Sequence, residues 1–193
     1  MMQFRSVGIG VTVAWMALLG ANEAARWMTT NLGQQLALSR AILLLFATAM
    51  YFTGAGDYGL RPPGRLPWIW MVPVSILLGV SVGVAGAVPG EWWLWVFIGF
   101  ADEVFVRGWL QAALSPIKQR LGAWSIPVLA SGLFAGSMYL VLMKQRAPGP
   151  TVMALVLGSS ALGLAAAKLR EESGSLVGPV AMHVLFGLGL ALA

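Results

Sequence analysis

The sequence has no cysteine, a single histidine and few charges of either sign. Only 10% of its 193 residues are Asp, Glu, Lys or Arg, whereas about 25% of the residues of a soluble domain are charged. The absence of thiols excludes a disulfide framework, a cysteine nucleophile and a cysteine-ligated metal. The shortage of charge excludes an ordinary soluble domain.

Apolar residues take the place of the missing charges. They make up 59% of the chain, and the mean hydropathy is +0.81. This composition predicts an integral membrane protein whose constant partner is the lipid bilayer. The net charge of +5 is then explained by loop residues that set the topology, and we expect no nucleic-acid partner.

Apolar runs of about 17–25 residues divide the chain into expected membrane spans. They predict an all-α, polytopic transmembrane helical bundle of about seven spans, built as a single membrane domain of residues 1–193. The first run, followed by ANEAA, also has features of a secretory signal, but we interpret it as a first helix because the later spans need an anchor. The expected spans are 7–21, 41–56, 66–88, 92–114, 126–143, 151–167 and 176–193.

The basic residues between these spans predict an orientation. Seven spans place Arg5, Arg61, Arg65, Lys118, Arg120, Lys168 and Arg170 on the side of the N-terminus, against Arg26, Arg40, Lys144 and Arg146 on the other side. Because cytoplasmic loops carry the excess of Lys and Arg, we expect a cytoplasmic N-terminus in a cytoplasmic (inner) membrane.

Two pairs of glycines recur at a spacing of four residues inside expected spans. Gly79 and Gly83 lie in the third span, and Gly132 and Gly136 lie in the fifth. Small residues at this spacing let transmembrane helices approach closely. The pairs therefore predict a compact bundle.

Three charged residues, in the stretch DEVFVRG, lie near the middle of the expected fourth span. Each charge at such a depth costs about 2.5–3.5 kcal/mol on insertion scales, so Asp102, Glu103 and Arg107 must face protein or a wet cavity. Glu103 and Arg107 are four residues apart and can pair on one helical face, which would be a purely structural use. That pairing leaves Asp102, about 100° away around the helix, as a candidate general acid or base.

The single histidine, His183, lies in the expected last span, at a depth similar to that of Glu103. An isolated histidine is usually structural, but an imidazole inside a membrane needs partners and titrates in a useful range. We expect the acids and His183 to meet around a polar cavity between the fourth, fifth and seventh spans. One histidine and two carboxylates leave zinc open as an alternative, although no metal-binding spacing is present and no cofactor is expected.

These residues resemble the motifs of the CAAX protease and bacteriocin-processing family, the glutamic-type intramembrane proteases that include the prenyl-protein endopeptidase. DEVFVRG is similar to the first motif, Glu-Glu-x-x-x-Arg, with Asp102 as the first acid. SGLFAGSMYL is similar to the second motif, Phe-x-x-x-His, but Met138 stands where the family has histidine, four residues after Phe134. HVLFG is similar to the third motif, His-x-x-x-Asn, with His183 matched and Gly187 in place of the asparagine.

The resemblance covers approximately residues 92–193 and implies an endopeptidase acting on a membrane-associated or lipidated peptide or protein. In that family the first acid and the second-motif histidine activate water, while the third-motif residues stabilise the oxyanion. Carried over by position, Asp102 and Glu103 are base and partner, and His183 polarises the carbonyl or shuttles a proton. Arg107 would hold the acid pair in register.

Three positions depart from that pattern. Asp102 is one methylene shorter than glutamate, which sets its carboxylate back by about 1 Å, a displacement that can cost about two orders of magnitude in rate. Met138 cannot accept a proton, and Gly187 offers no side-chain donor. Tyr139 and Ser137, beside Met138, are candidates to assist a reduced catalytic set.

Three functions are therefore compatible with the sequence. The first is an intramembrane endopeptidase that uses Asp102, Glu103 and His183. The second is a catalytically silent family member that acts as a membrane binding, immunity or sorting factor. The third, a proton-coupled carrier, is disfavoured because no span is visibly broken and no inverted repeat is present.

Overall fold

The computed structural model describes residues 2–54, 57–63, 71–86, 92–117, 119–143 and 149–192. Within these ranges the chain is a bundle of seven helical rods with one small antiparallel hairpin, which confirms the predicted all-α membrane bundle. The elements are α1 (Met2–Met28), α2 (Leu32–Phe52), α3 (Met71–Gly86), a rod of α4 (Trp92–Glu103), η1 (Val104–Leu110) and α5 (Gln111–Leu114), β1 (Arg120–Leu121), β2 (Trp124–Ser125), α6 (Ile126–Met143), α7 (Gly149–Ser173) and α8 (Val177–Leu192).

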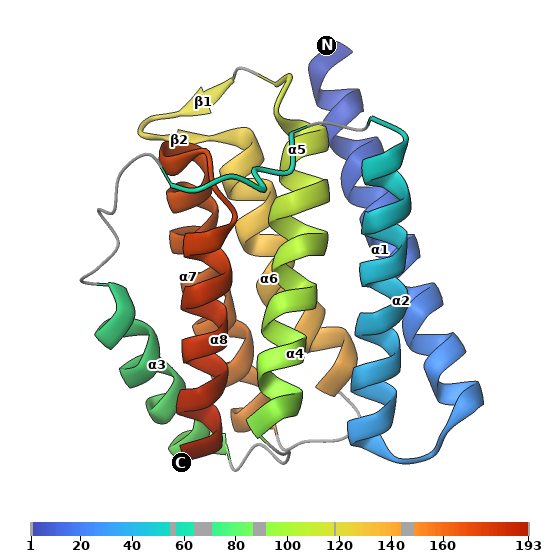
Figure 1. Cartoon of the computed structure of the whole chain (residues 1–193), viewed down its shortest axis with the longest axis vertical. Helices are drawn as coiled ribbons and strands as arrows, with labels where there is room; N and C mark the ends of the chain where they lie inside the picture. The colour runs from blue at the N-terminus through green and yellow to red at the C-terminus, as the bar shows by residue number, and fades with distance from the viewer. Residues whose placement is uncertain are drawn as a thin grey trace.

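Successive rods run in opposite directions, so α1 and α8 run the same way and the N- and C-terminal ends of the chain lie at opposite faces of the bundle (Figure 1). We call the face at which α1 begins the N-terminal face; it also carries the β1–β2 hairpin and the 57–63 segment. The α4–η1–α5 rod lies centrally and contacts α1, α2, α6, α7 and α8, whereas α3 packs on α7 and α8. The charged fourth span is therefore surrounded by protein.

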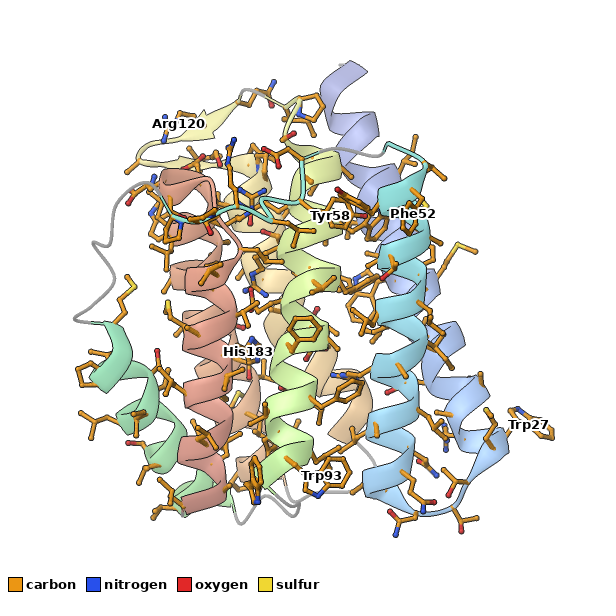
Figure 2. All side chains as sticks on the ribbon, viewed as in Figure 1. Trp27, Phe52, Tyr58, Trp93, Arg120 and His183 are labelled. Atoms are coloured by element: carbon orange, nitrogen blue, oxygen red, sulfur yellow. The ribbon has the colours of Figure 1, made fainter. Side chains whose placement is uncertain are left out.

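Among the described residues, three helices are long and apolar enough to cross a membrane: α1 from Gly8 to Met28, α2 and α7. Shorter apolar helices lie in α3, α6 and α8. Large apolar side chains such as Trp27 project outward from these helices rather than into the bundle (Figure 2). This arrangement suits a protein whose solvent is hydrocarbon.

The first two helices are longer than the sequence predicted, and one assignment based on their boundaries is wrong. α1 continues past position 21 because Asn22, Glu23 and Arg26 remain helical, the last two forming an i,i+3 ion pair of 3.0 Å. α2 begins after Asn31, whose side chain accepts a hydrogen bond from the Gln34 backbone N–H, as expected of an N-cap. Arg40 is therefore a buried residue within α2 and not a loop charge.

The expected fourth span is a continuous helical rod whose middle is a π-helix. The backbone N–H of Gln111 bonds to the carbonyl of Val106, five residues earlier. Segments of this kind are rare and often mark functional sites. Here the π-helix begins directly after Asp102 and Glu103 and contains Arg107.

The remaining spans agree closely with prediction where the structure describes them. α6 matches its expected range, and α7 and α8 differ from theirs by a few residues at the ends. Several predicted boundaries and loop charges lie outside the described residues, namely positions 56, 66, 88 and 193, Arg65, Lys118, Lys144 and Arg146.

Close helix packing at glycines, predicted from their spacing, is confirmed for α3 and α6. A Cβ atom on Gly79 would lie 3.0 Å from the Cα atom of Gly189 and would collide with the Phe186 carbonyl of α8. A Cβ atom on Gly132 would lie 2.9 Å from the Cα atom of Leu164 in α7. The backbones of α3 and α8 are therefore in close contact, and so are those of α6 and α7.

Replacing Gly189 with alanine should destabilise the bundle by about 1–3 kcal/mol, because the added methyl group meets the α3 backbone and forces the helices apart. The matched control is Gly20→Ala in α1, where nothing lies within 4 Å of the new Cβ. That substitution should be neutral or stabilising by up to about 1 kcal/mol. Thermal unfolding in detergent measures both; equal midpoints for the two variants would contradict the close contact of α3 and α8.

Candidate functional site

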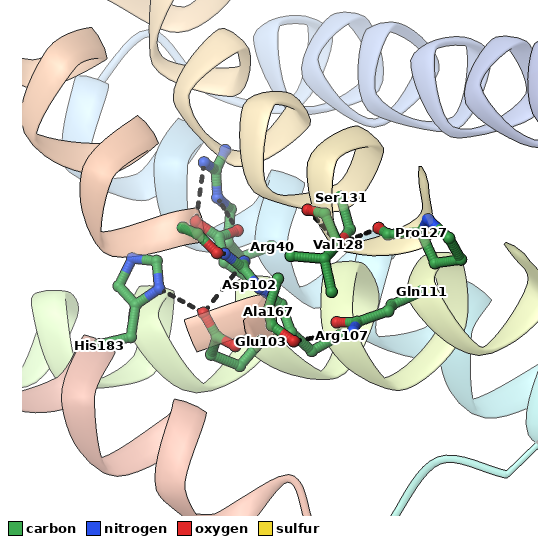
Figure 3. A network of polar contacts seen from close by, with 11 residues as sticks. Arg40, Asp102, Glu103, Arg107, Gln111, Pro127, Val128, Ser131, Ala167 and His183 are labelled. Carbon is green, nitrogen blue, oxygen red and sulfur yellow. Dashed lines mark hydrogen bonds and ion pairs between the residues drawn. The ribbon is translucent and has the colours of Figure 1, made fainter. Parts of the chain in front are cut away.

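Asp102 pairs with an arginine that the sequence analysis did not connect to it. Arg40 of α2 donates from Nε to Asp102 Oδ1 at 2.9 Å and from Nη2 to Oδ2 at 3.4 Å (Figure 3). The relative exposure is 0% for Arg40 and 1% for Asp102. Asp102 is thus not the unpaired acid that the spacing suggested, because a fork of two hydrogen bonds binds both of its oxygens.

Glu103 lies at the meeting point of two other side chains. Its Oε1 atom is 3.1 Å from Arg107 Nη1 and 2.7 Å from His183 Nδ1. All three residues are at most 2% exposed. The predicted i,i+4 pair and the predicted approach of the last span to the acids are both confirmed (Figure 3).

Glu103 and His183 each have a second polar atom that the contact between them does not use. Among the described residues, Glu103 Oε2 and His183 Nε2 are buried and have no hydrogen-bond partner. A buried polar group without a partner costs about 1–3 kcal/mol. Two such atoms on one hydrogen-bonded pair mark it as a place for further chemistry.

Arg107 and Gln111 join the central rod to α7. Arg107 Nη2 donates to the Gly163 carbonyl at 2.7 Å, and Gln111 Nε2 donates to the Ala167 carbonyl at 2.9 Å. Both bonds connect residues 56 positions apart. The rod and α7 therefore run in parallel, in register, and the residue of α7 level with Glu103 is Ser159.

Ser159 is a candidate site residue that the sequence analysis missed. It is 0% exposed, and its hydroxyl has no partner among the described residues. At about 100° per residue it faces between Gly158 and Gly163. A Cβ atom on Gly158 would lie 2.7 Å from Val82 of α3 and 3.9 Å from the Phe186 ring of α8. One on Gly163 would lie 2.6 Å from the Gly132 carbonyl of α6 and 2.9 Å from Arg107 Nη2.

The hydroxyl of Ser159 accordingly lies on the side of α7 that faces α8 and the central rod, level with Glu103. The signal in the sequence is faint, since it consists of two adjacent serines in an otherwise apolar span. Nothing in that pattern says which of the two faces the bundle interior.

The second-motif position is apolar and fully packed. Met138 is 0% exposed and belongs to the cluster that contains Phe105 and Phe134. Of its neighbours, Ser137 donates its hydroxyl to the Phe134 carbonyl of its own helix at 2.6 Å. Tyr139 is buried and interacts electrostatically with the acids and arginines of the site.

The third-motif position faces backbone. A Cβ atom on Gly187 would lie 3.0 Å from both the Cβ and the carbonyl oxygen of Trp95 in α4. One turn away, a Cβ atom on Gly99 would lie 3.1 Å from the His183 carbonyl carbon. The two glycines let α4 and α8 approach, and this approach brings His183 to Glu103.

Metal ligands are not gathered here. In the described ranges no group of three or more His, Asp or Glu side chains comes together. Glu103 and His183 would supply two ligands, while Asp102 is bound to Arg40.

A cavity of about 410 Å³ opens on the N-terminal face and ends at Arg107 and Gln111. Its walls come from the upper part of the central rod, the start of α6, the end of α7, the hairpin and the 57–63 segment. The cavity expected between the fourth, fifth and seventh spans differs from it, because α8 contributes no lining residue. Glu103 lies one turn beyond the cavity floor.

Replacing Arg40 with methionine should destabilise the protein by about 3–5 kcal/mol, because Asp102 would remain buried and charged without a partner. The double variant Arg40→Met/Asp102→Leu should recover most of that loss, since neither charge is then buried. The exposed pair Arg26 and Glu23 is the control, and breaking it should change stability by about 0–1 kcal/mol. Chemical denaturation in mild detergent gives all three free energies; additive losses at positions 40 and 102 would contradict the pairing.

Comparison with protein families assigns the chain to a group. The family model described as type II CAAX prenyl endopeptidase Rce1-like matches residues 85–189, which is more than half of the chain. No curated protein and no solved structure gives a significant match. The matched region contains the acids, Arg107, Met138, His183 and Gly187. The chain is an integral membrane protein that belongs to the Rce1-like family of type II CAAX prenyl endopeptidases.

Proposed function

We propose that this protein is an intramembrane endopeptidase that hydrolyses a peptide bond of a membrane-associated or lipidated substrate with a reduced catalytic set. The observation that carries the proposal is the 2.7 Å contact between Glu103 Oε1 and His183 Nδ1, with Oε2 and Nε2 both unpartnered among the described residues. The catalytic pair is then Glu103 and His183, with Asp102 in a positioning role.

The tautomer of His183 follows from its partner. When Nδ1–H donates to the Glu103 carboxylate, the neutral imidazole keeps a lone pair on Nε2. Nε2 takes a proton from water as the water oxygen bonds to the scissile carbonyl carbon. It then returns that proton to the amide nitrogen as the C–N bond breaks, which leaves a carboxyl group and an amine.

The neighbouring groups fix this pair. Glu103 orients the ring and stabilises the imidazolium, in the role that a carboxylate plays behind the histidine of hydrolase triads. Arg107 holds Glu103 and is itself bound to the Gly163 carbonyl. The Ser159 hydroxyl, level with Glu103 and without a partner in the described part of the chain, is suited to position the attacking water. Burial strengthens each of these interactions, because the surrounding dielectric is low.

A catalytically silent relative is the second candidate, and two observations favour it. Arg40 occupies both oxygens of Asp102, the acid in the first motif position. Met138 is packed among aromatic rings where the family has a histidine. In this alternative the pair of Glu103 and His183 joins α4 to α8, and the protein binds a membrane partner without cleaving it.

The corrected position of Arg40 also strengthens the proposed orientation. Without it, the loops on the N-terminal side keep seven basic residues in the sequence against three on the other side. A cytoplasmic N-terminus in a cytoplasmic membrane is the arrangement we propose.

Glu103→Gln and His183→Gln should each lower cleavage by about 10²–10⁴-fold, because either change removes the proton acceptor or its orienting partner. The measurement is the yield of new peptide termini in membrane fractions of cells that express wild type or variant, which detects cleavage of any membrane protein in those cells. Glu23→Gln, at an exposed acid of α1, is the control and should leave every product unchanged.

Wild-type cells with no terminus dependent on Glu103 or His183, at equal protein abundance, would exclude hydrolysis and support the silent relative. The silent relative further predicts that both glutamine variants lose stability or partner binding.

Ser159→Ala should lower cleavage by about tenfold to a hundredfold, because the attacking water loses a positioning hydroxyl. Ser159→Thr should restore part of the rate, since it restores the hydroxyl. The matched control is Ser160→Ala, because Ser160 packs against Gly136 of α6, away from the site. The yield of the same peptide termini at matched thermal stability is the measurement; equal rates in the two alanine variants would remove Ser159 from the site.

A further inference from the structure

The cavity on the N-terminal face holds an arginine without an ion-pair partner among the described residues. Arg170 of α7 lines the cavity and is only 9% exposed. Its Nη2 donates to the Asp57 carbonyl at 2.6 Å, and its Nε has no partner in the same part of the chain. A glycine at position 59, with φ +64°, lets the 57–63 segment cross directly over this guanidinium.

The other arginines of the cavity each have a carboxylate. Arg61 is 3.3 Å from Asp57, Arg120 is 3.7 Å from Glu171, and Arg107 binds Glu103. No carboxylate of the described residues lies within ion-pair distance of Arg170, although Asp57 and Glu171 also line the cavity and Asp57 acts on Arg170 at longer range. A nearly buried cation in this condition is unfavourable unless an anion joins it.

We propose that this cavity binds a phosphate-type oxyanion, with Arg170 as its main ligand and Arg61 and Arg120 at its rim. The side chains of Arg61 and Arg120 are 62% and 55% exposed, so each can turn toward a bound anion by exchanging its exposed ion pair and its hydrogen bond to a backbone carbonyl. A phosphate offers several oxygens, which three guanidinium forks can contact together. Arg170 is the cation of this cavity left without a carboxylate among the described residues, and it matches the net single negative charge of an anionic phosphodiester lipid, which the choline cation cancels in phosphatidylcholine.

The place of the cavity favours a phospholipid headgroup as the source of that phosphate. It lies at the ends of α6 and α7, and the adjoining hairpin exposes apolar side chains, with Leu121 at 67% and Trp124 at 38%. Basic pockets between transmembrane helices on the cytoplasmic side bind anionic lipid headgroups, and the N-terminal face is the side that we propose to be cytoplasmic. Free inorganic phosphate is the other source of the same chemistry.

Native mass spectrometry of the full-length protein tests this site with defined lipids. The protein is released from micelles that contain equal amounts of phosphatidylglycerol and phosphatidylcholine, and the bound lipids are counted. Wild type should retain phosphatidylglycerol roughly fivefold over phosphatidylcholine, which corresponds to the contribution of one basic residue near the surface. Arg170→Gln should reduce that ratio to about one, while Arg26→Gln, at an exposed arginine of the opposite face, should keep it.

Arg170→Lys is a second variant in case Arg170→Gln fails to fold, because lysine keeps the positive charge and loses only the paired donors of the guanidinium. Its ratio of phosphatidylglycerol to phosphatidylcholine should fall between those of wild type and Arg170→Gln. Millimolar inorganic phosphate that displaces phosphatidylglycerol from wild type would support the same oxyanion site with a soluble source. No lipid preference in wild type, or a preference unchanged in both Arg170 variants, would overturn the proposal. Displacement by a peptide with a free C-terminal carboxylate, but not by phosphate, would overturn it in favour of a peptide site.

Discussion

The cost of charge in hydrocarbon governs this structure. The central rod carries two acids and an arginine at mid-depth, and each must find a partner before the helix can remain in the bundle. Asp102 pairs with Arg40 of α2, and Glu103 contacts His183 of α8. Arg107 donates a hydrogen bond to a backbone carbonyl of α7. The same contacts that satisfy the charges therefore fix three helices around the fourth span.

The two adjacent acids have different partners because their side chains point toward different helices. Asp102 faces α2, where Arg40 binds both of its oxygens, and it is committed to structure. Glu103 faces α8 and, within the described part of the chain, keeps one oxygen free beside an imidazole with a free nitrogen. In the proposed function this motif of two acids provides one structural anchor and one catalytic group, which is the reverse of the assignment that sequence spacing favoured.

The sequence predicted what local spacing determines. Hydropathy predicted the helical bundle, and the i,i+4 spacing predicted the pair of Glu103 and Arg107. The contact of His183 with an acid was predicted because an imidazole inside a membrane needs a polar partner. The pairing of Arg40 with Asp102 was not predicted, because the two residues are 62 positions apart and Arg40 was assigned to a loop. Ser159 was not identified as a candidate because a single serine in an apolar helix produces no periodic pattern in the sequence. Long-range pairing and helix register decide both cases.

Arg107 connects the two polar regions of the molecule. It lines the cavity on the N-terminal face and also holds the carboxylate that binds His183. An anion bound there, as proposed, would compete with Glu103 for this guanidinium, and a weaker hold by Arg107 would leave the carboxylate more strongly engaged with the imidazole. Because these charges lie in a low dielectric, the charge held in the cavity and the strength of the Glu103–His183 contact one turn below it would be physically coupled.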